Sequence, residues 1–93
     1  MIFSLGRLLS TPGALSELER AGIPPALLLA RHASGDWGDV DSTDWAANER
    51  AIRDGSRLLS VYFAGSVKLY VITEATNDQN EREATTILLS SEY

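Results

Sequence analysis

The sequence predicts an α+β domain in which N-terminal helices pack on one face of a three-stranded antiparallel β-meander. Between residues 12 and 54 the hydrophobic residues recur at helical spacing, whereas from residue 57 onward they alternate with a period of two. Helices followed by strands, instead of a regular alternation of the two, are typical of α+β folds with antiparallel sheets. Because 93 residues leave room for one hydrophobic core, we expect a single domain over residues 1–93.

The composition is that of an ordinary globular protein. Hydrophobic residues make up 44% of the chain and charged residues 23%, which excludes the charge-rich, apolar-poor composition of disordered proteins. The chain has no cysteine and therefore neither a disulfide nor a thiolate metal site. Its apolar start is interrupted by Gly6 and Arg7, so we interpret it as folded protein and not as a signal peptide. No stretch reaches the roughly 20 apolar residues that cross a bilayer. We expect a cytoplasmic protein with no membrane partner.

The N-terminal half is expected to be mainly helical. Residues 2–9 are apolar at both odd and even positions, and this segment fits either a short buried strand or an extended lead-in. A threonine-proline pair then predicts a helix over Pro12–Ala21, since threonine caps free amides and proline has no amide to leave unpaired. A second helix is expected over Pro25–Ala33, where three consecutive leucines predict burial on most sides. Capping residues and a following glycine predict a third helix over Ser42–Asp54.

The C-terminal half is expected to form the sheet. A first strand begins at residue 57 and turns Leu59 and Val61 toward the core. A tight turn at residues 64–66 leads to a second strand over Val67–Glu74, and Thr85–Leu89 forms the third. The polar segment Thr76–Glu83 is expected to be a solvated, mobile loop. The predicted core residues are Leu15, Leu18, Leu28, Leu29, Trp45, Ile52, Leu59, Val61, Leu69, Val71, Ile87 and Leu89.

The chain is acidic, with thirteen acidic side chains against eight basic ones and a formal charge of −5. A field of that sign repels a phosphate backbone, so we expect no direct nucleic-acid binding. The only clustered cations are Arg50, Arg53 and Arg57. Glu49 and Asp54 lie among them, which weakens any basic footprint.

One histidine and the aspartates that follow it form the only set of residues with catalytic or metal-binding potential. They are His32, Asp36, Asp39 and Asp41, and a small nucleic-acid-processing enzyme that uses them is one alternative function. The set lacks the paired spacing of strong metal and catalytic motifs. We therefore favour structural roles, with His32 at the end of a helix and the aspartates in a turn and a helix cap. No catalytic residue, metal or cofactor is expected.

Trp37 lies in the turn GDWG and has two interpretations. It is either a buried plug between the second helix and the sheet or an exposed anchor for a partner. Tryptophan is highly buried on average, so we favour the plug. Gly35 and Gly38 then supply backbone freedom, because no nucleotide-binding glycine motif is present.

Several short motifs follow one another along the chain in a characteristic order. They are Leu28–His32, Gly35–Val40, Asp44 with Asn48, Gly55–Arg57, Ser60–Tyr62, Ile72–Ala75, Thr85–Leu89 and Glu92-Tyr93. With them the chain resembles a family of small proteins common on bacterial plasmids, phages and other mobile elements, often described as plasmid-related or restriction-system proteins. The resemblance covers nearly the whole chain, and its most specific part is Arg31-His32 followed by GDWG. It implies a mobile-element setting and supplies no mechanism. The Thr76–Glu83 segment departs from it, since the family link is shorter.

The remaining distinctive feature is a set of acidic residues that we predict to bind a partner. They are Glu17, Glu19, Asp39, Asp41, Asp44 and Glu49. Such a surface is usually only solvated, but it also suits a protein that competes with nucleic acid for a basic groove.

These observations lead to the hypothesis of a small non-enzymatic protein-binding module of a mobile genetic element. It would inhibit a host defence complex, such as CRISPR interference or restriction, by binding a ribonucleoprotein or nuclease of the host. A further alternative is a homo-oligomeric structural or regulatory protein whose open strand edge pairs with a second copy. The chain is expected to be a monomer or a homodimer.

Overall fold

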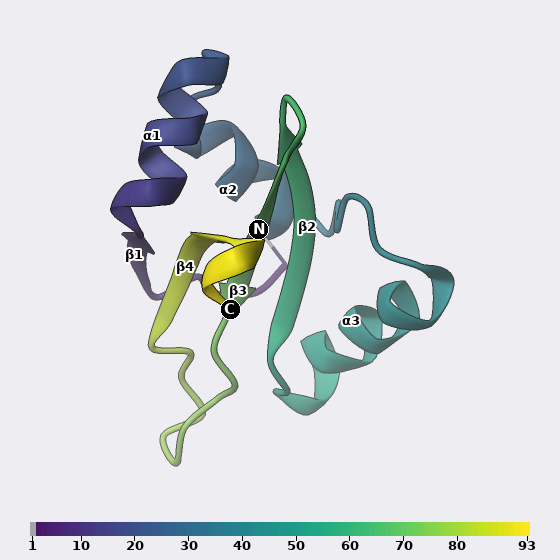
Figure 1. Ribbon diagram of the computed structural model, residues 1–93. Helices are drawn as coiled ribbons and strands as arrows, with labels where there is room; N and C mark the ends of the chain where they lie inside the picture. The colour runs from purple at the N-terminus through teal and green to yellow at the C-terminus, as the bar shows by residue number, and fades with distance from the viewer. Residues whose placement is uncertain (1) are drawn as a thin grey trace.

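The computed structural model describes residues 2–93 and confirms the α+β class (Figure 1). It contains three α-helices and a four-stranded mixed sheet. In chain order the elements are β1 (Arg7–Ser10), α1 (Pro12–Ala21), α2 (Pro25–Ala33), α3 (Ser42–Asp54), β2 (Leu58–Ala64), β3 (Val67–Thr73), β4 (Ala84–Leu89) and a short 3-10 helix, η1 (Ser90–Glu92). None of the helices in this described range is long and apolar enough to cross a membrane.

The sheet has one more strand than predicted, and that strand runs parallel to its neighbour. The strand order is β1-β4-β3-β2. Strands β2, β3 and β4 are antiparallel neighbours as expected, but β1 pairs with β4 in parallel and places Arg7 beside Ala84. Residues 7–9 are exposed, so the alternative of a buried N-terminal strand is wrong. The extra strand forms because the backbone groups along the β4 edge would otherwise lack partners.

All three helices span the residues that the sequence predicted, because their ends are local signals. The side chains of Thr11 and Asp41 each accept a hydrogen bond from the amide three residues later, at 3.1 and 2.8 Å. Gly22 and Gly55 end α1 and α3 in the left-handed conformation, with φ of 71° and 82°.

The predicted register of β2 is wrong by one residue. Ser60 and Tyr62 are buried beneath the helices, whereas Leu59, Val61 and Phe63 lie on the opposite face of the sheet. On that face Phe63 is 45% exposed, but Val61 is buried as predicted, at 6%. Hydrophobicity did not distinguish the two faces, because both parities of this strand carry apolar groups. The hydroxyl groups of the two buried residues form hydrogen bonds with α2 and with the turn after it, and these bonds compensate the loss of hydration on burial.

The core forms two clusters. The larger one joins α1 and α2 to the antiparallel strands, and the smaller one surrounds Trp37 and joins α3 to the start of β2. Leu15 and Trp45 were predicted to be buried, but they are 45% and 40% exposed, because α1 packs through Ala14 and α3 through Asn48 instead. The predicted core residues that are buried are Leu18, Leu28, Val61, Leu69, Val71 and Ile87, and those that are partly buried are Leu29, Ile52, Leu59 and Leu89.

The outer edge of β2 is closed by α3 and by the turn that precedes it. The Asn48 side chain donates to the Leu59 carbonyl at 2.7 Å and accepts from the Leu59 amide at 3.1 Å. Further along the same edge, the Val61 amide donates to the Trp37 carbonyl and the Val61 carbonyl accepts from the Asp39 amide. A side-chain amide and a short stretch of backbone therefore take the place of a fifth strand.

The first testable prediction concerns Asn48, which is 5% exposed. Asn48→Ala removes both partners of Leu59 and leaves two backbone groups unsatisfied, so we expect the free energy of unfolding to fall by about 2 kcal/mol. Urea denaturation of the variant measures the loss. Thr43→Ala, at an exposed position of the same helix, is the matched control and should change stability by less than about 0.5 kcal/mol. Equal effects of the two substitutions would contradict the role assigned to Asn48.

Candidate functional site

The GDWG turn is a plug, as the sequence predicted. Trp37 is fully buried, and its ring stacks on Phe3 at a centroid distance of 5.9 Å and meets the edge of His32 at 5.6 Å. Its indole Nε1 donates to the Glu49 carboxylate at 2.9 Å. Gly38 has φ of 76°, and a side chain there would overlap a carbonyl of β2. The turn therefore connects α2, α3 and the edge of the sheet, and Trp37 is not available to a partner.

A second prediction compares the two tryptophans. Trp37→Ala removes a fully buried ring and should lower the free energy of unfolding by about 3 to 5 kcal/mol. Trp45→Ala removes a ring that is 40% exposed and should cost markedly less. Thermal unfolding followed by circular dichroism distinguishes the two. Melting of the Trp37→Ala protein at the temperature of the parent would show that the turn does not hold the core together.

A chain of buried polar side chains crosses the sheet beneath α2. His32 is fully buried, with Nδ1 at 2.5 Å from the Ser60 hydroxyl and Nε2 at 2.9 Å from the Thr73 hydroxyl. The Thr73 hydroxyl lies 2.6 Å from that of Thr85, which donates to the Leu5 carbonyl at 2.7 Å. The chain thus connects α2, three strands and the segment before β1.

The last member of this chain sets the direction of every hydrogen bond in it. A carbonyl only accepts, so Thr85 uses its single hydrogen on Leu5, and Thr73 must donate to Thr85. His32 then donates to Thr73 from Nε2, and in the neutral ring the remaining nitrogen, Nδ1, accepts from Ser60. Burial, assisted by the charge of Arg82, lowers the pKa of His32 to about 4.

The structure does not bring together the histidine and the aspartates that the enzyme hypothesis requires. The Asp36 carboxylate binds the Arg31 guanidinium at 2.7 Å, and this hydrogen bond lowers the pKa of the Asp36 carboxyl. Both ring nitrogens of His32 are occupied by hydroxyl groups instead. Among residues 2–93 no group of three His, Asp or Glu side chains is close enough to hold a metal ion. The buried position of His32 fits a structural role and does not support the enzyme hypothesis.

The pH dependence of stability tests the His32 chain. The folded-state pKa of about 4 lies below the ordinary value of 6.5, so the unfolded chain binds the proton more tightly. The stability contributed by the neutral ring is complete above pH 6.5 and is lost as the pH falls toward 4. Between pH 7 and pH 5 we expect a loss of about 2 kcal/mol, measured by urea denaturation.

The matched control is His32→Gln, which removes the only histidine of the chain. Its stability should change much less over the same interval, because the carboxylates titrate mainly below pH 5. A parent protein whose stability does not respond to pH between 7 and 5 would contradict a neutral buried imidazole.

The six acidic residues predicted to bind a partner fall into two separate groups. Helices α1 and α3 lie on opposite sides of the β2–β3 hairpin (Figure 1), so the two carboxylates of α1 are remote from the others. On α1, Glu17 pairs with Arg20 at 3.6 Å and Glu19 is exposed. The group at the start of α3 consists of Asp39, Asp41, Asp44 and Glu49. Two of its members also have structural roles, since Asp41 caps α3 and Glu49 binds Trp37.

An exposed tryptophan lies within the α3 group, which the sequence did not predict. Trp45 is 40% exposed in the first turns of α3 and, with Val40 and Ala46, lines a shallow apolar hollow. The hollow is also lined by the carboxylates of Asp41 and Glu49 and by Arg50 and Arg53. We call Val40, Asp41, Trp45, Ala46 and Glu49 the Trp45 surface. The sequence contained a signal for it, because Trp45 lies in the first turn of a helix next to the capping residues and after polar neighbours of the same turn.

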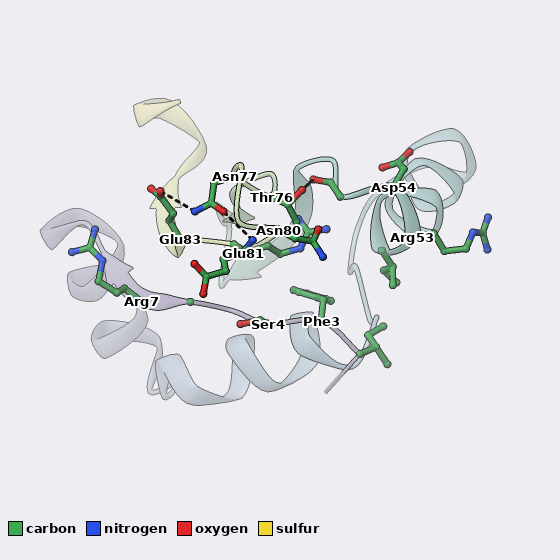
Figure 2. Close-up of a pocket in the computed structure, with 15 residues that line it drawn as sticks. Phe3, Ser4, Arg7, Arg53, Asp54, Thr76, Asn77, Asn80, Glu81 and Glu83 are labelled. Atoms are coloured by element: carbon green, nitrogen blue, oxygen red, sulfur yellow. Dashed lines mark hydrogen bonds between the residues drawn. The ribbon is translucent and has the colours of Figure 1, made fainter.

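A larger cleft of about 680 Å³ lies between the N-terminal segment, the end of α3 and the loop after β3. Figure 2 shows the loop side chains Asn80 and Glu81 facing the segment that carries Phe3 and Ser4. Its charged lining is balanced, with Arg7, Arg53 and Arg82 against Asp54, Glu81 and Glu83. This balance favours no single class of ligand.

Arg82 corrects the prediction that the loop over Thr76–Glu83 is merely solvated. It is 7% exposed, and its guanidinium donates to the carbonyls of Ala51, Ser56 and Glu74 at 2.8 to 3.0 Å. These bonds compensate the cost of burying the cation and fix the loop to the end of α3. Arg82 therefore acts as a clamp between the loop and the helix.

Comparisons of the chain with protein families, with curated proteins and with solved structures gave no match. Function must therefore be argued from the chain's own geometry. The buried histidine and the buried tryptophan serve the fold, and the balanced cleft favours no ligand. The Trp45 surface is the part of the described structure where an exposed tryptophan stands in an apolar hollow, edged by two carboxylates and two guanidinium groups.

Proposed function

We propose that this chain is a small non-enzymatic protein-binding module of a mobile genetic element, and that it inhibits a host defence complex in the cytoplasm by binding a protein component through the Trp45 surface. The observation that carries the proposal is the exposure of Trp45 in an apolar hollow edged by charged groups. Exposed tryptophans are over-represented among the residues that dominate binding energy at protein interfaces.

The chemistry of the Trp45 surface defines the partner. A ring that is 40% exposed still has area to bury, and a partner with an apolar pocket would remove it from water. Asp39, Asp41 and Asp44 are exposed at the N-terminal side of α3, whereas Arg50 and Arg53 line the hollow further along the helix. A partner whose basic groups face the N-terminal side is therefore favoured. Proteins that handle nucleic acid present such basic surfaces, which supports a ribonucleoprotein or nuclease as the target. The carboxylates of α1 are too remote to take part.

The mobile-element and inhibitor parts of the proposal rest on the resemblance carried by Arg31-His32 and GDWG. The structure gives these motifs a physical reason, because Arg31 holds Asp36 while His32 and Trp37 build the core. Motifs that specify the fold leave the binding surface free to vary between targets. Four of the five residues of the Trp45 surface lie outside the motifs that carry the resemblance, and Val40 is the exception.

Protection of a plasmid tests this function. The chain is produced in bacteria that carry an active CRISPR or restriction system, and the transformation efficiency of a targeted plasmid is measured. The parent should raise the efficiency and Trp45→Ala should abolish the rise, with at least about 30-fold weaker binding to the captured component, which corresponds to 2 kcal/mol. Leu27→Ala, at a residue that is 53% exposed on α2, is the control and should protect like the parent.

Two results would refute the proposal. One is the absence of protection against every defence system tested, with no defence protein recovered on the immobilised chain. The other is full protection by the Trp45→Ala protein. Glu17→Ala should also protect like the parent, because that residue lies on α1, away from the Trp45 surface.

A further inference from the structure

One face of the sheet has no helix against it. The buried residues of α1 and α2 pack against Tyr62, Leu69, Val71 and Ile87, which all lie on one face. Residues of the other parity, including Phe63 and Tyr70, form what we call the open face. Val61, Ile72 and Ala84 on this face are only 5 to 7% exposed, and the C-terminal turn reaches across it, where Tyr93 meets Tyr70 edge to face at 5.5 Å.

The open face carries aromatic rings next to cations. Phe63 of β2 stands directly opposite Lys68 of β3, and Tyr70 follows two residues later on the same face. The guanidinium of Arg57 lies over the Tyr93 ring at 5.3 Å. Phe63 is 45% and Tyr93 61% exposed, so at least two rings are accessible on this face.

We infer that the open face binds single-stranded nucleic acid, with bases stacked on Phe63, Tyr70 and Tyr93 and phosphates held by Arg57, Lys68 and Arg7. Neighbouring aromatic rings on a sheet suit unpaired bases, because every base presents a flat face for stacking. Adjacent cations then neutralise the phosphates that connect those bases. The bases of a duplex are already stacked on each other, so a duplex could not stack its bases on these three aromatic rings.

The net charge of −5 argues against such binding, but the charges are not evenly spread. The open face holds three of the eight cations, Arg7, Arg57 and Lys68. Arg7 belongs to it because it pairs with Ala84, which lies on the same face of the sheet as Lys68. Asp39 beside the β2 edge and Glu74 after β3 border it, and at the β1 edge Arg7 also lines the cleft that carries Asp54, Glu81 and Glu83. At physiological salt, exposed charges more than about 8 Å apart are largely screened, so Arg57 and Lys68, which stand next to the rings of Tyr93 and Phe63, decide the interaction.

This inference is independent of the protein-binding function, because the two surfaces are different. The Trp45 surface lies on α3 and the turn before it, and the open face lies on the sheet. A defence ribonucleoprotein offers both a basic protein surface and exposed single-stranded nucleic acid, but neither contact requires the other. Variants can therefore test each surface alone.

The experiment is a titration of the full chain into fluorescein-labelled oligothymidine and oligouridine of about 12 nucleotides, followed by fluorescence anisotropy. We expect saturable binding of at least one of them, and weaker binding of a duplex of equal length. With three cations involved, the slope of log affinity against log salt should be about −2, so raising salt from about 50 to 200 mM weakens binding about 20-fold. Phe63→Ala and Lys68→Glu should each weaken binding about 10-fold or more.

Two variants serve as matched controls. Arg20→Ala removes an exposed cation from α1, and Trp45→Ala removes an exposed aromatic ring from the other surface. Both should bind the oligonucleotides like the parent. Circular dichroism and thermal unfolding show whether Phe63→Ala and Lys68→Glu are folded, and their exposed positions favour that outcome.

Several outcomes would overturn the inference. One is the absence of saturable binding at protein concentrations up to about 100 μM, the scale of non-specific binding. Equal affinity for duplex, or unchanged affinity of both Phe63→Ala and Lys68→Glu, would also exclude the stacking platform. Sedimentation showing a stable dimer that Phe63→Ala converts to a monomer would assign the open face to a second copy of the chain instead.

Discussion

The fold depends on a single ordered chain of hydrogen bonds that begins at the Leu5 carbonyl and ends at Ser60. Because its first acceptor is a carbonyl, each hydroxyl along it has only one way to point, and the imidazole of His32 is restricted to one tautomer. The chain places polar groups in the middle of the sheet face that the helices cover, where hydrophobic packing alone would not define how α2 sits. Every buried side-chain nitrogen and oxygen in residues 2–93 has a partner. The polar chain thus fixes the position of α2 on the sheet without leaving unsatisfied groups.

Both edges of the sheet are arranged so that their backbone groups find hydrogen-bond partners. At the β2 edge, Asn48 and the backbone of the GDWG turn provide the hydrogen bonds of a missing strand. At the opposite edge β1 is only four residues long, and short edge strands reduce unwanted pairing between molecules. The broad surfaces that remain for recognition are therefore the open face and the start of α3. The alternative of a homo-oligomer through an open strand edge has only β1 to use.

The helices and the plug could be predicted because their signals are local. Thr11, Asp41 and the glycines that follow each helix act on backbone groups a few residues away, so they hold in any tertiary context. The register of β2 could not be predicted, because Ser60 and Tyr62 are buried only if hydroxyl partners from distant residues are in place. For the same reason Trp45 was assigned to the core and Arg82 to a solvated loop. Their environments are set by which face of α3 meets the sheet and by carbonyls brought together from three different segments.

The parallel pairing of β1 with β4 has a consequence for how the protein is made. Residue 7 finds its partner at residue 84, so β1 leaves the ribosome long before the strand that it joins exists. Contacts so distant in sequence close slowly, and until they form β1 is an unpaired segment with two exposed leucines. The helices and the β2–β3 hairpin have no such delay, since their contacts are close in sequence. Completion of the sheet therefore waits until β4 has been made, and loss of β4 would remove two strands from the sheet instead of one.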